Sequence, residues 1–367
     1  MSKADEIGGL SNDVLLLFVP LPKRPEWIER ISKRFKGLQV RWVCAIKDDK
    51  SMVTAKDVPA EVLDGVTLLS TYRPPPVELI PHVRFVQLNS AGVDSWIGHP
   101  TYEDPAVTIC TSNGIHAPQI AEWVIGAWLF HQRQFLHFTE NMKKGYWPPS
   151  PFATQVQDSP GMRMGILGYG AIGRQCARLG SALGMEIYAY TRSERATPES
   201  RKDDSYCVPR TGDPEGLLPA KWFHGTSAGA VNAFLAQDLD FLVLSLPLTP
   251  ETRGILSHPQ FEILGSRKDG KKPFIANVAR GGHIDQEALI EALETGTICG
   301  AALDVTNPEP LPAEHPLWRA PNLLLTPHIS WVSSFLPDRL LDVLECNLER
   351  LGTGKPLINV VDRKLNY

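Results

Sequence analysis

The chain has 367 residues, about two to three times the size of a common single domain, so its length predicts two domains. Its 37 basic and 41 acidic side chains give a formal net charge of −4 with both signs mixed along the sequence, which argues against a nucleic-acid partner. The apolar runs are much shorter than the roughly 20 residues of a membrane span, so we expect no membrane segment. The polar amino terminus predicts no signal peptide, and we expect a cytoplasmic protein.

The amino-terminal part of the chain alternates short apolar runs with helical patterns. One helical pattern occupies Trp27–Phe35. Strands are predicted at Val14–Val19, Leu38–Val43, Val66–Ser70, Phe85–Leu88 and Val107–Cys110. This alternation is typical of an α/β domain.

A long apolar helix is predicted at Pro118–His137, and a connection rich in proline follows it at Pro148–Gly161. The rest of the chain contains apolar runs without strict alternation, as buried parallel strands do. These six runs are Met164–Leu167, Glu186–Tyr190, Phe241–Leu246, Phe274–Val278, Ala301–Val305 and Leu323–Thr326. They predict a doubly wound parallel sheet, which the four prolines of Thr191–Ala236 interrupt as a loop-rich insertion.

A G-x-G-x-x-G pattern stands between the first of these strands and a predicted helix, which is the context of a dinucleotide-binding turn. Its first glycine permits a tight turn, its second lets the backbone approach a pyrophosphate, and its third allows close packing of helix on strand. The two amides after the second glycine face the anion. The predicted cofactor contacts are Gly168, Gly170, Ala171, Ile172 and Gly173.

The next strand ends in Thr191, Arg192 and Ser193, without the carboxylate that would accept hydrogen bonds from the ribose of NAD. An arginine with two hydroxyls suits the 2′-phosphate of NADP(H), so we predict that cofactor. The alternative is that Arg192 is an ordinary solvated residue, in which case NAD(H) also binds.

Four polar motifs follow in order at the ends of the last predicted strands, where ligands bind in open α/β sheets. Arg280, Asp304, Glu309 and His328 carry them, with 29 residues from Arg280 to Glu309 and 19 from Glu309 to His328. Taken singly, an Arg-Gly-Gly turn or a histidine at a strand end is often structural. Together with the glycine turn, this order and spacing resemble the D-isomer-specific 2-hydroxyacid dehydrogenases, a family that includes glyoxylate/hydroxypyruvate reductases.

The resemblance covers nearly the whole chain and implies a role for each motif. His328 would be the general acid/base, with Glu309 fixing its tautomer and favouring its protonated form. Arg280 would hold the carboxylate and carbonyl of a 2-keto acid. Ala279 and Asp304 would lie against the cofactor, Asp304 at the nicotinamide carboxamide.

The resemblance also extends to the amino-terminal part of the chain. Residues 89–94 are similar to the family's substrate-binding loop, so Ala91 and Gly92 are expected to bind the substrate carboxylate. The implied fold is two Rossmann-like, doubly wound parallel-sheet domains with the cofactor domain inserted into the substrate domain. Residues 1–112 and 331–367 would form the substrate-binding domain, and residues 113–330 the NAD(P)-binding domain.

We therefore expect an NADPH-dependent reductase of small 2-keto acids that acts as a homodimer. Two alternatives stay open: an NAD-linked dehydrogenase working oxidatively, and a nucleotide-sensing scaffold or corepressor on the same fold. The six cysteines are scattered without metal-site spacing, so we expect no metal site and interpret them as reduced, mostly buried side chains.

Overall fold

The computed structural model describes residues 7–47, 49, 51–149 and 156–366. The chain divides into two compact units, residues 1–115 with 334–367 (unit 1) and residues 116–333 (unit 2). The division expected from the sequence puts each boundary three residues earlier, after residues 112 and 330. The roles expected for the two parts remain predictions. Residues 150–155, within the proline-rich connection, lie outside the described residues.

Unit 1 is built on a five-stranded parallel sheet with the order β2-β1-β3-β4-β5. Its strands are β1 (Val14–Val19), β2 (Gln39–Cys44), β3 (Leu68–Thr71), β4 (Phe85–Leu88) and β5 (Thr108–Cys110). Its helices are α1 (Pro25–Arg34), α2 (Ala60–Leu63), α3 (Pro100–Glu103) and α11 (Leu336–Thr353), with short 3-10 turns at Ala55–Asp57 and Val77–Leu79.

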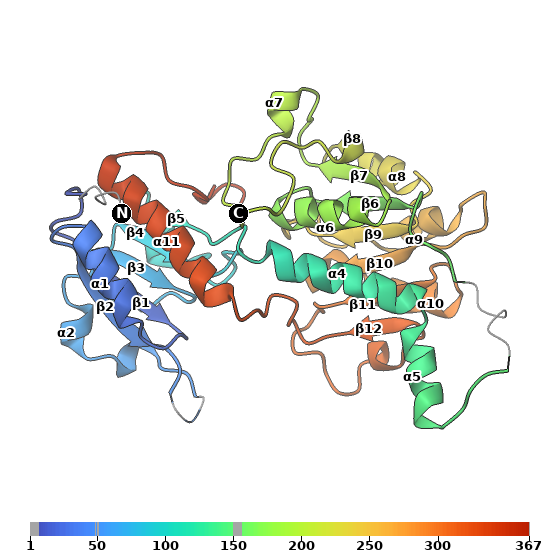
Figure 1. The fold of residues 1–367 in the computed structure, drawn as a ribbon, viewed down its shortest axis with the longest axis horizontal. Helices are drawn as coiled ribbons and strands as arrows, with labels where there is room; N and C mark the ends of the chain where they lie inside the picture. Colours follow the sequence, from blue (N-terminus) through green and yellow to red (C-terminus); the bar gives the residue numbers. More distant parts are fainter. Residues whose placement is uncertain (1–6, 48, 50, 150–155, 367) are drawn as a thin grey trace. The chain divides into compact units, whose positions relative to one another are not determined.

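The carboxyl-terminal helix α11 returns to unit 1 and packs beside α1 (Figure 1). Leu341, Leu344 and Leu348 of α11 share a buried cluster with residues of β1 and α1. At the rim of this cluster, Glu345 of α11 accepts hydrogen bonds from two arginines of α1. The end of the chain therefore completes the domain that its beginning starts.

Unit 2 is built on a seven-stranded parallel sheet with the order β12-β11-β10-β9-β6-β7-β8. The strands are β6 (Arg163–Leu167), β7 (Glu186–Thr191), β8 (Pro219–His224), β9 (Phe241–Leu244), β10 (Phe274–Asn277), β11 (Gly300–Leu303) and β12 (Leu323–Leu325). The helices are α4 (Ala117–Gln132), α5 (Phe135–Lys143), α6 (Ala171–Ala182), α7 (Pro198–Arg201), α8 (Ala228–Leu235), α9 (His258–Gly265) and α10 (Gln286–Glu294). Short 3-10 turns lie at Gly281–His283 and Pro316–Arg319.

Successive residues of the central strands point to opposite faces of this sheet and enter two separate cores. Phe241 and Val243 of β9 belong to the core that α4 and α6 cover, whereas Leu242 and Leu244 belong to the core under α8, α9 and α10. The indole of Trp128 on α4 stacks on Phe241, with 4.9 Å between ring centroids. Helices thus cover both faces of a parallel sheet, and the predicted fold class is confirmed.

Two expectations about unit 2 are corrected. The helix expected at Pro118–His137 ends at Gln132, because Gln134 takes a left-handed conformation (φ 53°) and α5 starts after it. The expected insertion contains α7, β8 and α8 rather than loop alone. Strand β8 lies at the sheet edge, where its first residue, Pro219, needs no ladder hydrogen bond, and its half-exposed residues lack the apolar run of a central strand.

Burial differs among the six cysteines, which are all free thiols. Cys110 and Cys176 are buried, and burial raises the pKa of each thiol to about 12. Cys207 is exposed and the other three are half-buried, so the expectation that most are buried is wrong. No helix of the described residues is long and apolar enough to cross a membrane.

Candidate functional site

The glycine-rich turn follows β6, the strand beside which the order of the sheet reverses, and leads directly into α6. Gly168 has a φ of +96°, and a Cβ there would lie 2.8 Å from the backbone nitrogen of Leu246. A Cβ on Gly173 would lie 2.2 Å from the Gly168 carbonyl oxygen. At Gly170, in contrast, a Cβ would meet no atom within 4 Å. The turn is thus packed against the end of its own strand and against the segment after β9, but it is open at Gly170, where a pyrophosphate would approach, so its residues fit a dinucleotide.

The end of β7 carries the three residues expected at the adenosine ribose. Arg192 and Ser193 are exposed, and the Thr191 hydroxyl donates to the Ser193 carbonyl at 2.7 Å. The hydrogen bond from Thr249 lowers the pKa of Glu251, and the charge of Arg192 adds to this shift. Arg192 therefore lies within electrostatic range of a carboxylate, with its guanidinium accessible to solvent.

His328 and Glu309 form a directly bonded pair in unit 2. Nδ1 of His328 lies 3.0 Å from Oε2 of Glu309, and the side chains are 44% and 38% exposed. The backbone amide of Thr306 donates to the other carboxylate oxygen of Glu309 at 2.9 Å. Because Glu309 accepts from Nδ1, Nε2 is the ring nitrogen that can exchange a proton with a ligand.

The backbone of His328 is held in a left-handed conformation, with a φ of 53°. Its amide donates to the backbone oxygen of Asp304 at 2.8 Å. The Asp304 carboxylate, 1% exposed, accepts from the hydroxyl of Thr326 and from the amides of Ile329 and Ser330, at 2.5, 2.9 and 2.9 Å. Asp304 thus holds the loop around His328 from both sides of the histidine. Its expected contact with the nicotinamide remains a prediction.

Arg280 follows β10, and two side chains lie within hydrogen-bond distance of its backbone carbonyl oxygen. Its carbonyl oxygen lies 3.0 Å from Nδ2 of Asn277 and 2.9 Å from Nδ1 of His283, and Nη1 donates to the carbonyl of Ala279. His283 is fully buried, and its Nε2 lies 3.2 Å from the Pro247 carbonyl. Burial lowers the pKa of His283, so a neutral ring donates to one of these carbonyls at a time.

The turn after Arg280 packs against the loop that carries Glu309. A Cβ on Gly281 would lie 2.0 Å from the carbonyl carbon of Thr306, so only glycine fits there. Gln286, at the start of α10, bonds both the amide and the carbonyl of Asn307. The loops after β10, β11 and β12, which are neighbours in the sheet, therefore form one continuous polar edge.

Ala91 and Gly92 lie in unit 1, in the loop after β4. The Ser90 hydroxyl donates to the Gly92 carbonyl at 2.7 Å, and the Ser112 amide donates to the Ser90 carbonyl. Ala91 is exposed, so its backbone is accessible to a ligand. The binding of a substrate carboxylate by this loop remains a prediction.

Several supporting residues were not singled out in the sequence. They are Asn277, His283, Gln286, Thr306, Thr326 and Ser330. All lie within a few residues of Arg280, Glu309 or His328 in sequence or in space. Their residue types gave no signal, because each acts through one or two hydrogen bonds to backbone or carboxylate groups that only the folded loops bring near.

A family model described as "D-isomer specific 2-hydroxyacid dehydrogenase, NAD binding domain" matches residues 125–218 and 223–330. These residues make up more than half of the chain and lie within unit 2. They include the glycine-rich turn and the loops that carry Arg280, Glu309 and His328.

Characterised relatives cover most of the chain. Hydroxypyruvate reductase of Blautia hydrogenotrophica is 28% identical over 336 residues, which cover 90% of this chain and 95% of that protein. Glyoxylate/hydroxypyruvate reductase A of Salmonella typhimurium is 30% identical over 303 residues, which cover 80% of this chain and 85% of that protein.

Solved structures share the fold over almost the full length. An NADPH-dependent glyoxylate/hydroxypyruvate reductase of Sinorhizobium meliloti, in complex with NADP and sulfate, has a TM-score of 0.71 at 27% identity and covers 97% of this chain and 100% of its own. A D-isomer specific 2-hydroxyacid dehydrogenase of Xanthobacter autotrophicus, in complex with NADPH and MES, has a TM-score of 0.72 at 27% identity with the same coverage. From the matched domain and the relatives that cover the whole fold, we conclude that this chain belongs to the D-isomer specific 2-hydroxyacid dehydrogenase family of nicotinamide-dependent oxidoreductases.

Proposed function

We propose that this protein reduces small 2-keto acids to D-2-hydroxy acids with NADPH. The observation that carries the proposal is the hydrogen-bonded pair of His328 and Glu309, at the same sheet edge as Arg280. Reduction of a keto acid needs a cation for the carboxylate and a proton donor for the carbonyl oxygen, and this edge offers both.

A reduced nicotinamide, when bound, supplies a hydride to the carbonyl carbon. Arg280 binds the substrate carboxylate and polarises the carbonyl, because its guanidinium is always charged and presents a planar fork of donors. His328 gives the proton on Nε2 to the carbonyl oxygen as negative charge develops there. Glu309 keeps the other ring nitrogen protonated and in place, and the neutral histidine then takes a proton from solvent.

The preference for NADPH is proposed from the end of β7. Arg192 and Ser193 are exposed where the 2′-phosphate would lie, and residues 189–193 include no carboxylate that would accept hydrogen bonds from the ribose of NAD. The Sinorhizobium meliloti and Xanthobacter autotrophicus relatives were solved with NADP and NADPH. These two complexes support the preference by similarity.

The test follows the absorbance of the nicotinamide while glyoxylate, hydroxypyruvate, pyruvate and bulkier 2-keto acids are added in turn with NADPH or NADH. We expect NADPH to be consumed with at least one small 2-keto acid and the product to be the D isomer. The reverse reaction, run with D-2-hydroxy acids and NAD, tests the oxidative alternative. Binding of NADPH without turnover of any of these acids would favour a nucleotide-sensing scaffold and contradict the proposal.

We also propose that the protein forms a homodimer through α5. The apolar side chains of α4 lie in the core of unit 2 and are not available for such a contact. Several exposed apolar side chains are grouped on α5 and just after it, at Phe135 (51% exposed), Leu136 (54%), Met142 (73%), Tyr146 (55%) and Trp147 (92%). A second copy presents the same surface, so the two can bury each other about a two-fold axis.

Light scattering on a size-exclusion column measures the mass of the parent protein and of a Met142→Ser, Trp147→Ser double variant. We expect a dimeric parent and a variant whose mass falls toward 40.6 kDa on dilution. A monomeric parent, or a variant that stays as dimeric as the parent at every dilution, would contradict the use of α5.

A further inference from the structure

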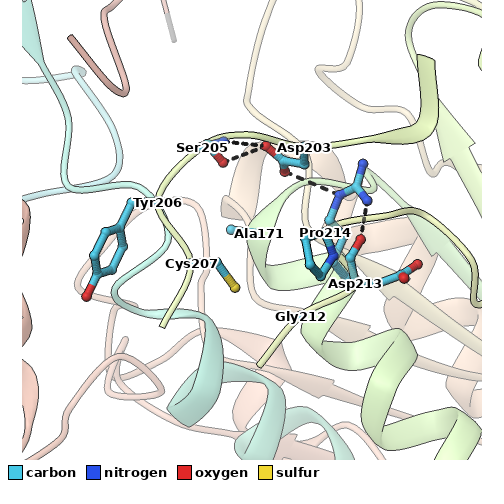
Figure 2. A pocket seen from close by; sticks show the side chains of 9 residues that line it. Ala171, Asp203, Ser205, Tyr206, Cys207, Gly212, Asp213 and Pro214 are labelled. Carbon is cyan, nitrogen blue, oxygen red and sulfur yellow. Dashed lines mark hydrogen bonds and ion pairs between the residues drawn. The ribbon is translucent and has the colours of Figure 1, made fainter. Parts of the chain in front are cut away.

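The segment between α7 and β8 packs on the first turns of α6, next to the glycine-rich turn. We call residues 203–214 the strap. Its Gly212 amide donates to the side-chain oxygen of Gln175 on α6 at 2.6 Å. Figure 2 shows the hollow between them, with Ser205, Cys207 and Asp213 of the strap around Ala171, the first residue of α6.

A buried arginine on α6 is the main anchor of the strap. Arg174 is 5% exposed, and its two terminal nitrogens donate to the backbone carbonyls of Asp213 and Arg201. Its Nε lies 3.2 Å from the Asp203 carboxylate. The guanidinium also lies over the ring of Tyr169, 5.0 Å from the ring centroid. One side chain of the dinucleotide-binding helix therefore holds both ends of the strap.

The second anchor comes from the glycine-rich turn itself. Tyr169, between its first two glycines, is 4% exposed and donates its hydroxyl to the Asp213 carboxylate at 2.8 Å. The same carboxylate, 6% exposed, accepts from the amides of Leu217 and Leu218 at 3.0 and 3.1 Å. Burial and the Asp213 charge raise the pKa of Tyr169, so the hydroxyl remains a donor at neutral pH.

These contacts place the strap beside Ala171, whose backbone amide would face the pyrophosphate of a bound dinucleotide. They also restrain a turn whose glycines would otherwise be conformationally free, and a turn already held in its bound conformation loses less entropy when ligand binds. We propose that the strap is part of the dinucleotide site, and that Tyr169, Arg174 and Asp213 are positioning residues that set affinity for the cofactor. The proposal rests on dinucleotide binding at this turn, the cofactor half of the proposed function.

The test compares Tyr169→Phe and Asp213→Asn with the parent enzyme. Each variant keeps the shape of its side chain. Tyr169→Phe removes the donor of the bond between turn and strap, and Asp213→Asn removes the charge of the acceptor and one of its two acceptor oxygens. Loss of a hydrogen bond to a charged group changes an equilibrium constant roughly 10- to 150-fold. Part of this effect lowers the stability of the free enzyme, and the rest lowers its affinity for NADPH. We therefore expect the dissociation constant for NADPH, measured by calorimetry, to rise about 5- to 30-fold, with kcat at saturating NADPH within about twofold of the parent.

Tyr188→Phe is the matched control, because it removes one hydroxyl from a buried tyrosine of β7 that donates to Glu186 and does not touch the strap. We expect its NADPH affinity to equal that of the parent. The Tyr169→Phe, Asp213→Asn double variant should bind NADPH no worse than the single variant with the lower affinity, since both changes act on the same bond.

Two results would overturn the proposal. One is an NADPH affinity within twofold of the parent in both single variants, and the other is an equal loss of affinity in Tyr188→Phe. Thermal unfolding of the free enzymes is measured with each titration, so that a variant that does not fold is recognised. If Asp213→Asn does not fold, the NADPH affinity of Tyr169→Phe, the milder change, tests the proposal. The parent enzyme's own NADPH binding and turnover test the proposed function separately, so the two can fail independently.

Discussion

Replacement of Asp304 by asparagine tests how this protein holds His328, the proposed general acid. The carboxylate accepts three hydrogen bonds from the loop around His328, two at Oδ1 and one at Oδ2. Asparagine keeps the first oxygen and puts an amide donor opposite the Ser330 amide, which leaves a buried donor without an acceptor. That loss costs about 1–3 kcal/mol in stability. The left-handed backbone of His328 costs roughly 1–2 kcal/mol more than a right-handed one, so a weakened loop releases the histidine from its position.

We therefore expect Asp304→Asn to lower the free energy of unfolding by about 2 kcal/mol and kcat for keto-acid reduction roughly 10- to 100-fold. Urea denaturation followed by tryptophan fluorescence measures the first, and initial rates of NADPH oxidation at saturating substrate measure the second. Asp240→Asn is the control. The Asp240 carboxylate likewise accepts a hydrogen bond from a backbone amide, that of Arg163, at 2.8 Å, but Asp240 lies just before β9, at the amino ends of the strands. It should lose stability and keep its kcat.

The result that would refute this reasoning is an Asp304→Asn enzyme with normal kcat and a cofactor KM raised tenfold or more. Asp304 would then act through the nicotinamide, as the family resemblance implies, and the loop around His328 would be held by its remaining contacts. A loss of kcat in Asp240→Asn equal to that in Asp304→Asn would also refute it, because the effect would follow from stability alone.

Three further predictions concern the cofactor, the substrate carboxylate and the proton. If Arg192 pairs with the 2′-phosphate, kcat/KM should favour NADPH over NADH by about 10- to 150-fold, and Thr191→Asp with Arg192→Ala should erase the preference; equal efficiency in the parent would contradict this. Arg280→Lys keeps the charge and loses the forked geometry, so keto-acid KM should rise and kcat fall while NADPH titrations stay unchanged. His328 must be protonated for reduction, so kcat/KM should fall as pH rises, and oxidation of the hydroxy acid should rise over the same range. His328→Asn should cost roughly 10²–10⁴ in kcat; a near-normal rate in His328→Asn would show that another group supplies the proton.

The features that the sequence predicted well are those that depend on near neighbours in the chain. Strands β1 and β4 coincide with the predicted residues, because each is an apolar run bounded by turn-forming residues. The glycine-rich turn was recognisable because a left-handed conformation and two close backbone approaches need glycine at fixed spacing. The order of Arg280, Glu309 and His328 indicated one edge of the sheet, because parallel strands end on the same side.

The remaining features depend on contacts between residues far apart in the chain, which carry no local pattern. Strand β8 exists because β7 offers it an edge to pair with, and not because residues 219–224 are apolar. The expected insertion contains the strap because Arg174 and Tyr169 bind residues 27 to 44 positions away. Asp304 holds the loop around His328 for the same reason: its partners come within hydrogen-bond distance only when β11 and β12 lie side by side. Sequence alone therefore indicated which residues are candidates for the chemistry, whereas tertiary structure decided what holds them in place, because a buried polar side chain takes its partners from whatever the folded chain brings near it.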